Sequence, residues 1–336
     1  MKRILIVNVN WLGDAVMTTP LFKAIKEALP SCYLAVMVVP RLVDVFSQNP
    51  YIDEIIIFDA KTLHRSFKEK LKFAKFLKEK NFDTAFLIHR SFTRAFILWL
   101  AGIKSRIGYR RLKNFFVLTK KIEPPPKNLH RQDYYLYLFE NCGFIIKDRF
   151  PKIFFDDSDR LEARDFVFDL KRKHKFVVGI NPAGNWKPKR WPASYFARLA
   201  DELIDQLNAS ILFVGSAKDI DVVNEVINNM KNTAINLAGK TTIKKLAALM
   251  EYLDLFISND SGPAHIAASQ GTNTIVIFGP TSDKITSPIG RAVKIIKKPI
   301  NCIIPCYKKN CLDNICMKNI LPSQVFLEAK TILLNR

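Results

Sequence analysis

The sequence predicts an α/β protein made of two doubly wound halves, each a parallel sheet with helices on both faces. Three observations lead to this prediction. The chain of 336 residues is too long for one ordinary core. Short apolar runs rich in β-branched residues alternate with amphipathic stretches, and the alternation occurs in both halves. With 49% hydrophobic residues, each half can bury a core.

The first half is expected to contain four buried parallel strands: RILIVNV (3–9), YLAVMVV (33–39), EIIIF (54–58) and TAFLIH (84–89). Helices are expected over 16–29, 66–80 and 131–142. Three consecutive prolines within 119–131 exclude a helix there and favour extended chain. A polar hinge near 147–160 places the end of the first domain at residue 155.

The second half repeats this organisation and forms a domain over 156–320, followed by a closing C-terminal helix within 321–336. Its expected strands are FVVGI (176–180), SILFVG (210–215), DLFIS (254–258) and NTIVIFG (273–279). Helices are expected over 159–172, 194–207, 219–230, 242–251, 262–270 and 322–334. Two such domains are expected to face each other across a cleft, with ligands beyond the carboxyl ends of the strands.

The charge balance limits the partners. The chain has 52 lysines and arginines against 31 acidic residues, a net charge of +21, which suits anionic lipid or phosphorylated substrates, or belongs to a solvated surface. No zinc-finger spacing or RNA-binding aromatic signature occurs, so no nucleic-acid partner is predicted. The longest apolar run, AFILWLAGI (95–103), is too short to span a bilayer, and the N-terminus does not resemble a signal peptide. A cytoplasmic protein is expected.

The first motif is NVNWLGDAVMTTP, in which a strand ends, Gly13 lies in a short turn and a helix starts near Asp14. Asp14 is interpreted either as a helix N-cap or as a carboxylate available as a general base. The turn lacks the three-glycine dinucleotide fingerprint and is not a P-loop, so a nicotinamide cofactor is not expected.

Two further motifs follow strands of the second half. In NPAGNWKPKRWPASYF, a stiff loop positions Lys189 for a diphosphate, and Trp191 is a packing anchor. In FVGSAKDID, Ser216 follows a strand and Asp219 enters a helix. Asp219 is either a helix-terminal charge or an acceptor for a ribose hydroxyl.

The last motif, SNDSGPAHIAAS (258–269), joins a strand to a helix that begins near Gly262. The amides of Asp260, Ser261 and Gly262 are expected to be free at the positive end of the helix. His265 lies on the first turn, either as a packing residue or as a phosphate donor. The stretch is interpreted as a phosphate-binding turn opposite Lys189.

Three of these strings, WLGDAVMTTPLFKAIK, NPAG…KRWP and NDSGPAHIAAS, resemble glycosyltransferase family 9, the ADP-heptose:lipopolysaccharide heptosyltransferases of GT-B fold. The resemblance covers essentially the whole chain, and WLGDAV and NDSG are more similar to the second heptosyltransferase than to the first. It implies inverting transfer of heptose from ADP-heptose to the lipopolysaccharide inner core, with Asp14 as the catalytic aspartate and Lys189 as the phosphate-binding lysine. The donor-binding residues that it implies are Gly13, Gly184, Asn185, Ser216, Asp219, Thr241, Asp260, Ser261, Gly262 and His265. Gly184 and Asn185 occupy a donor-loop position where relatives carry hydroxyl residues.

The same resemblance implies an anionic acceptor of lipid A and Kdo inner-core sugars at the inner membrane surface, so the protein is expected to associate peripherally with the cytoplasmic face of the inner membrane. Basic residues in HRSFTR (89–94) and GYRRLKNFF (108–116), and near His130, are candidates for acceptor binding, or belong to solvated helix faces. These candidates are Arg90, Arg94, Arg110, Arg111 and Arg131.

No metal is expected to be required for catalysis, because protein cations supply the charge that a metal would. Four cysteines, Cys302, Cys306, Cys311 and Cys316, lie within fifteen residues and are interpreted as ligands of a structural zinc or as reduced thiols. Two alternatives for the whole chain remain open: a family relative that transfers another sugar in cell-surface polysaccharide synthesis, and a nonenzymatic protein that binds anionic polysaccharide or nucleic acid.

Overall fold

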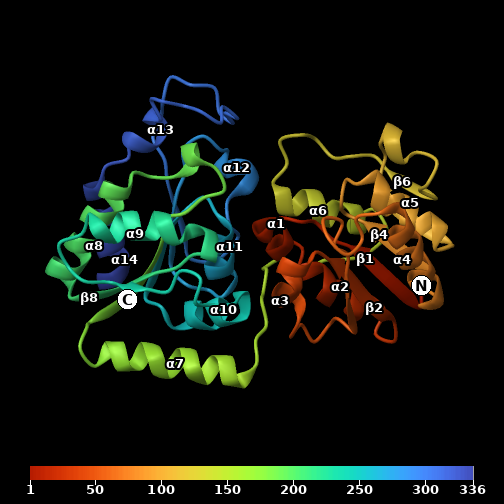
Figure 1. The fold of residues 1–336 in the computed structure, drawn as a ribbon, viewed down its shortest axis with the longest axis horizontal. Coiled ribbons are helices and arrows are strands. Elements are labelled where there is room, and N and C mark those ends of the chain that lie inside the picture. The colour runs from red at the N-terminus through yellow and green to blue at the C-terminus, as the bar shows by residue number, and fades with distance from the viewer. Residues whose placement is uncertain (336) are drawn as a thin grey trace. The chain divides into compact units, whose positions relative to one another are not determined.

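The chain divides after Phe154 into two compact units in the computed structural model, which describes residues 1–335. The division lies beside the boundary expected after residue 155. Residues 1–154 are called unit 1 and the remainder unit 2, and each has its own sheet (Figure 1). No helix within residues 1–335 is both long and apolar enough to cross a membrane.

Unit 1 contains a six-stranded sheet of order β3-β2-β1-β4-β5-β6, and every neighbouring pair is parallel. The strands are β1 (Arg3–Val7), β2 (Tyr33–Val38), β3 (Glu54–Ile57), β4 (Thr84–Leu87), β5 (Ser105–Tyr109) and β6 (Lys120–Ile122). The α-helices are α1 (Leu12–Met17), α2 (Pro20–Ala28), α3 (Val43–Phe46), α4 (Phe67–Glu79), α5 (Phe92–Leu100) and α6 (Arg131–Glu140), with 3₁₀ turns η1 (Pro40–Leu42) and η2 (Leu112–Asn114).

The helix expected over 16–29 is instead two helices, α1 and α2. The hydroxyl of Thr18 donates to the carbonyl of Ala15 at 2.7 Å, and that of Thr19 donates to Val16 at 2.8 Å. These bonds satisfy carbonyls at the end of α1, and Pro20 then opens α2, where a missing amide costs nothing. The strands β5 and β6 and the helix α5 were not expected from the sequence.

Alternate residues of the strands in unit 1 point to the same face of the sheet and form its core there. Leu5 and Val7 of β1 and Ala35 and Met37 of β2 belong to one buried cluster with the apolar faces of α4 and α5. The intervening residues of β1 are also fully buried, because helices cover both sheet faces. This explains why these strands read as unbroken apolar runs.

Unit 2 has the same arrangement, with order β12-β11-β10-β7-β8-β9 and parallel neighbours throughout. Its strands are β7 (Phe176–Asn181), β8 (Ala209–Phe213), β9 (Ile235–Asn236), β10 (Leu255–Asn259), β11 (Thr274–Ile277) and β12 (Val293–Ile296). The α-helices are α7 (Asp157–Lys171), α8 (Ala193–Leu207), α9 (Ile220–Asn228), α10 (Ile243–Tyr252), α11 (Gly262–Ser269), α12 (Asp283–Thr286), α13 (Ile315–Lys318) and α14 (Pro322–Leu334), with 3₁₀ turns η3 (Lys187–Lys189) and η4 (Ala217–Asp219).

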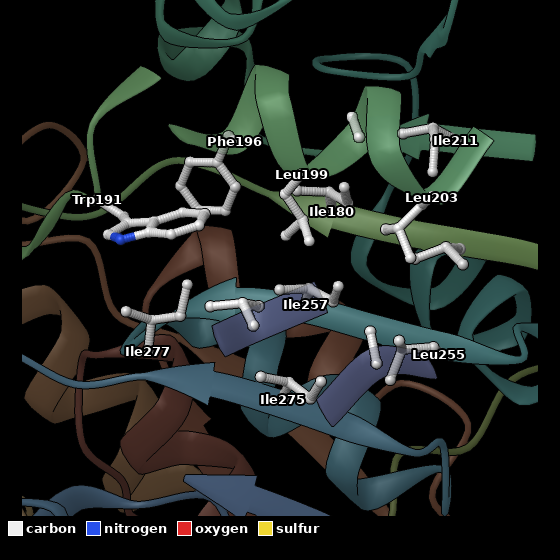
Figure 2. Packing of buried hydrophobic residues seen from close by; sticks show 14 of the residues in the cluster. Ile180, Trp191, Phe196, Leu199, Leu203, Ile211, Leu255, Ile257, Ile275 and Ile277 are labelled. Atoms are coloured by element: carbon white, nitrogen blue, oxygen red, sulfur yellow. The ribbon is translucent and has the colours of Figure 1, made fainter. Parts of the chain in front are cut away.

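Aliphatic side chains of β7, β8, β10 and β11 meet those of α8 in the core of unit 2, with Trp191 and Phe196 at one end (Figure 2). The ring centroids of Trp191 and Phe196 are 4.9 Å apart, with the planes perpendicular. The indole nitrogen of Trp191 donates to the carbonyl of Ile320 at 2.8 Å. Trp191 is therefore a packing anchor, as expected, and it ties its loop to the chain that leads into α14. The helix α14 belongs to this core through Val325, Ala329 and Leu333.

The strand orders define one switch point in each sheet. From β1 the chain builds outward to β2 and β3 and then returns to β4 on the other side, and from β7 it does the same with β8, β9 and β10. In open α/β sheets, ligands bind beyond the carboxyl ends of the strands at such a point. The predicted doubly wound fold is confirmed in both units.

Candidate functional site

Several of the predicted residues lie at these two switch points. In unit 1, Asp14 follows β1 and Arg90 follows β4. In unit 2, the loop with Lys189 follows β7, and Asp260 follows β10. The two halves of the candidate site are described separately.

Asp14 lies in the first turn of α1, whose N-cap residue is Trp11. The interpretation of Asp14 as the N-cap is therefore wrong, because the helix begins earlier than the sequence suggested. The carboxylate instead accepts a hydrogen bond from the Tyr135 hydroxyl of α6. Its Oδ1 atom also lies 3.9 Å from Nε of Arg131. Asp14 is thus oriented by side chains rather than by a helix terminus.

Burial raises the pKa of Asp14 above its ordinary value, although the Tyr135 hydrogen bond and the charges of Arg131 and Arg90 oppose the shift. Burial and the negative charge of Asp14 raise the pKa of Tyr135 well above its ordinary value. The shared proton therefore stays on Tyr135 at neutral pH. A partly desolvated carboxylate with a raised pKa is better matched to accepting a proton than an exposed one.

Three of the five expected arginines gather around Tyr134 and Tyr135 of α6. Arg131 approaches Asp14, as described above. The guanidinium of Arg90 lies 5.2 Å from the ring centroid of Tyr134, and Nη2 of Arg111 donates to the Tyr134 hydroxyl at 3.1 Å. These three cations form a basic surface beside the carboxylate.

The other two arginines do not join them. Arg94 is 3% exposed, and its guanidinium donates to the carbonyl of Asn8 and to Oδ1 of Asn10, each at 2.8 Å. Arg94 therefore fixes the turn after β1 and cannot present its charge to an acceptor, which corrects the prediction. Arg110 is exposed and pairs with Glu123 at 2.6 Å. Its cation is already matched by a neighbouring carboxylate.

In unit 2, Lys189 forms a largely buried ion pair with Asp260. Nζ lies 2.6 Å from Oδ2 of Asp260, and the hydroxyl of Thr281 donates to the same oxygen at 2.7 Å. The lysine is positioned as expected, but by a carboxylate of the neighbouring turn and not by loop stiffness alone. It reaches the expected phosphate-binding turn from the adjacent strand end.

Polar residues at the ends of β7 and β10 hold these turns together. Nδ2 of Asn259 donates to the carbonyl of Pro182 at 2.8 Å. Oδ1 of Asn259 accepts from the backbone amide of Trp191 at 3.1 Å. Nδ2 of Asn181 donates to Oγ of Ser261 at 2.9 Å, and Oγ of Ser258 lies 2.8 Å from the same atom. The hydroxyl of Ser261 is thereby fixed at the N-terminus of α11.

The helix α11 begins at Gly262, and no side chain caps it at Ser261. The first amides of a helix have no partner within it, so those of Ser261 and Gly262 suit an anion. The Asp260 amide is different, because it donates to the carbonyl of Ile277 at 3.2 Å. The prediction that the Asp260 amide is free was therefore wrong. His265 is buried in the first turn of α11.

The remaining donor candidates lie in nearby loops of unit 2. Gly184 is buried, and its carbonyl oxygen accepts a hydrogen bond from Nε of Arg190 at 3.0 Å. Asn185 is exposed. Oδ2 of Asp219 accepts from the amide and the hydroxyl of Ser216, at 2.9 and 2.7 Å, in a capping box. Asp219 thus has the structural role considered for it, and its contact with ribose stays a prediction. Thr241 lies just before the N-cap of α10.

The four cysteines near the C-terminus are free thiols. Within residues 1–335, no three histidine, cysteine or acidic side chains are placed to hold a metal ion. The thiol of Cys316 instead donates to Oδ1 of Asn314, and the Asn314 amide donates to Cys311. Burial raises the pKa of Cys316. This arrangement does not fit a preformed zinc site at Cys302, Cys306, Cys311 and Cys316.

Sequence reasoning missed several residues of the site. Tyr134 and Tyr135 lie in the helix expected over 131–142 but were not singled out, although a buried tyrosine usually needs a hydrogen-bond partner for its hydroxyl. Asn181 and Asn259 each end a buried strand, and a polar residue at that place indicates a turn that needs hydrogen bonds. Thr281 follows β11 and carried no such signal.

The sequence of this chain is similar to those of known glycosyltransferases. A sequence model of glycosyltransferase family 9 (heptosyltransferase) matches residues 70–316. Lipooligosaccharide heptosyltransferase 2 of Campylobacter jejuni is 32% identical over 331 residues, covering 96% of each chain. Lipopolysaccharide heptosyltransferase 2 of Escherichia coli is 27% identical over 314 residues, covering 88% of each.

Solved structures give the same result for the fold. A family 9 glycosyltransferase from Veillonella parvula superposes with a TM-score of 0.89 at 26% identity, covering 100% of this chain and 98% of that one. The ADP-heptose heptosyltransferase II of Escherichia coli superposes with a TM-score of 0.83 at 25% identity, covering 100% and 99%. The expected GT-B fold is confirmed. Together with the family match over most of the chain, these relatives show that the protein is a glycosyltransferase and belongs to family 9, the heptosyltransferases.

Proposed function

We propose that the chain transfers heptose from ADP-heptose to a lipopolysaccharide inner-core acceptor, with inversion at the anomeric carbon. Heptose transfer in the lipopolysaccharide core is the activity of the family and of the matching relatives, so the coarse function follows from membership. The nonenzymatic alternative is excluded on the same ground. The donor, the acceptor position and the stereochemistry are the parts proposed.

The single observation that carries the mechanism is the environment of Asp14. Its carboxylate is partly buried, has a raised pKa and is oriented by Tyr135 and Arg131 at the switch point of unit 1. A general base must be deprotonated yet basic enough to take a hydroxyl proton. The raised pKa makes Asp14 a stronger base than an exposed carboxylate, while the Tyr135 hydrogen bond and the charges of Arg131 and Arg90 favour its ionised form.

The reaction then needs one displacement. An acceptor hydroxyl loses its proton to Asp14, and its oxygen bonds to the anomeric carbon of the heptose as the bond from that carbon to the diphosphate oxygen breaks. The electron pair of that bond leaves with ADP. A single displacement inverts the anomeric centre and requires no covalent nucleophile.

The leaving diphosphate gains negative charge in this step. Lys189 and the amides of Ser261 and Gly262 are the groups of unit 2 suited to receive it. We propose that the diphosphate replaces Asp260 as the partner of Lys189, so that these groups supply the positive charge, transfer needs no catalytic metal and activity survives a chelator. A structural zinc at the four cysteines stays a separate prediction, and elemental analysis of the purified protein tests it.

The acceptor carries anionic groups, and Arg90, Arg111 and Arg131 lie beside the proposed base. We propose that these three arginines bind the acid and phosphate groups of the inner core. The enzyme would then work on the cytoplasmic side, at the anionic surface where such an acceptor is anchored.

The deciding experiment incubates the purified enzyme with ADP-heptose and an inner-core acceptor that carries one heptose. Mass spectrometry should show the addition of one heptose, and NMR should show an anomeric configuration opposite to that of the donor. An acceptor without heptose serves as the comparison. Transfer only to that acceptor, transfer of a different sugar in preference, or retention of configuration would each contradict the corresponding part of the proposal.

A further inference from the structure

A long stretch of unit 1 contains no acidic side chain. From Thr84 to Ile122 the chain has nine lysines and arginines and no aspartate or glutamate. In α4, by contrast, glutamates accompany the lysines. Residues 284–312 of unit 2 form a second stretch without an acidic side chain, with seven lysines and arginines. The acid-free stretch of unit 1 includes α5, η2 and the strands on either side of η2.

The same stretch exposes aromatic side chains on α5. Phe92, Phe96 and Trp99 follow each other at spacings of four and three residues, which places them on one side of the helix. Their rings stack in sequence, with centroids 5.9 and 5.4 Å apart. Phe92 and Trp99 are each about half exposed, although the opposite side of α5 is buried in the core.

The loop around η2 exposes two more large apolar residues. Leu112 is 95% exposed and Phe116 is 91% exposed. The base of the loop is fixed, because Asn114, Val117 and Leu118 are buried. Leu112 and Phe116 therefore project from an anchored loop.

The loop is also tied to the end of α5, against which η2 packs. Arg106 donates from Nε to the carbonyl of Val117 at 2.6 Å and from Nη1 to the carbonyl of Ile103. We call the resulting surface the α5–η2 face. Its members are Phe92, Phe96, Trp99, Leu112 and Phe116, with Lys104, Lys113, Lys120 and Lys121 in the same stretch.

We propose that the α5–η2 face docks on an anionic lipid bilayer, which rests on the proposed function because that function places the acceptor at a membrane. Phe and Trp rings and a leucine suit the boundary between headgroups and acyl chains, and lysines suit the anionic headgroups above it. Reversible membrane binding commonly combines these two signals, because either alone is weak.

Charge argues against a second copy of the chain on this face. Two copies would bring the charges of Lys104, Lys113, Lys120 and Lys121 together, and the stretch that carries them has no carboxylate of its own to compensate them. A nucleic acid would match the charge, but its bases stack on aromatic rings, and the aliphatic Leu112 at the tip of the loop offers no such contact. An anionic bilayer accounts for both features.

The test compares two double variants. The first variant, Leu112→Glu/Phe116→Glu, replaces the two most exposed apolar side chains of the face with carboxylates. The matched control is Leu161→Glu/Phe168→Glu in α7 of unit 2, a helix with several acidic residues, where the two side chains are 47% and 53% exposed. Binding is measured by cosedimentation with vesicles of phosphatidylcholine containing about one third phosphatidylglycerol, and with vesicles of phosphatidylcholine alone.

The wild type should bind the anionic vesicles and not the neutral ones. The Leu112→Glu/Phe116→Glu variant should bind at least about tenfold more weakly, whereas the control should bind as the wild type does. Unchanged unfolding midpoints in urea would show that both variants fold. Undiminished binding by the first variant, or an equal loss in the control, would overturn the assignment. A dimer that the first variant abolishes in sedimentation velocity would also overturn it.

Heptose transfer separates this inference from the proposed function. With an acceptor stripped of its acyl chains, the Leu112→Glu/Phe116→Glu variant should match the wild type. With the acceptor in anionic vesicles, it should be slower. If the wild type fails on the soluble acceptor, the proposed function fails and the vesicle-binding result still decides the face.

Discussion

The two units share one topology but differ in charge and in how their sites are built. Unit 1 contains 27 lysines and arginines against 13 acidic residues, whereas unit 2 contains 25 against 18. At the switch point of unit 1, a single carboxylate is oriented by one tyrosine and nearby arginines. At that of unit 2, a buried ion pair and several asparagine and serine side chains fix two turns. Equal folds therefore carry different chemistry, which resides in the turns after the strands.

The sharpest way to break this comparison is Asp14→Asn. The amide keeps the shape of the side chain but cannot accept the proton, so turnover should fall by about a thousandfold. The affinity for ADP, measured by calorimetry, should not change, because Lys189, Ser261 and Gly262, which are proposed to bind the diphosphate, belong to unit 2. Wild-type turnover in the variant would remove Asp14 from the role of base.

Arg94→Ala tests whether Arg94 holds the turn after β1 in place, the role that its contacts indicate instead of acceptor binding. Losing a buried guanidinium with two hydrogen bonds should lower the free energy of unfolding by about 2–3 kcal/mol, measured in urea. Arg110→Ala is the control, since its exposed pair with Glu123 is screened by water and should contribute little to stability. Equal stability of the two variants would show that Arg94 is not needed to hold the turn after β1.

Lys189→Ala should weaken ADP binding by about tenfold and slow transfer as well, because its charge serves the bound donor and the leaving diphosphate. Lys187→Ala, in the same loop but exposed, should have a smaller effect on both. An unchanged dissociation constant for ADP in Lys189→Ala would place the phosphate site elsewhere in unit 2.

The smallest expected effect on activity is that of Tyr135→Phe, which tests how the Tyr135 hydrogen bond tunes the pKa of Asp14 in unit 1. The Tyr135 hydrogen bond lowers the pKa of Asp14, so its loss raises that pKa further. The base works when deprotonated, and activity is lost as the pH falls through its pKa. The acid limb of the kcat/KM profile should therefore move to higher pH. Tyr137→Phe, on the same helix, should leave the limb in place.

The fold was predictable wherever strands were buried on both faces. The apolar runs of β1, β2, β7 and β10 were recognised because helices cover both sides of them. The strands β5, β6 and β12 carry lysine, arginine or serine and lie toward the sheet edges, where burial no longer sets the pattern. The helix α5 was seen only as an apolar run, since its exposed aromatics blur the periodicity of an amphipathic helix.

The candidate site was predictable in the positions of its motifs and not in the contacts between them. Asp14, Lys189 and Ser261 could be placed at strand ends from local sequence alone. The partners of Asp14 and Lys189, which are Tyr135 and Asp260, come from distant segments or other strand ends, and only the strand order brings them together. Arg94 shows the opposite error, because a basic residue in a charged string was taken for a surface cation.

The ion pair between Lys189 and Asp260 means that the lysine already has an internal counterion before any donor binds. A ligand that takes the lysine then replaces a carboxylate of the protein itself, not mobile ions from the solution. Buried pairs are screened far less than exposed ones. ADP affinity should accordingly respond only weakly to added salt, whereas attachment through the exposed lysines of unit 1 should be strongly salt-dependent. Ionic strength would thus release the enzyme from a charged surface while leaving its nucleotide in place.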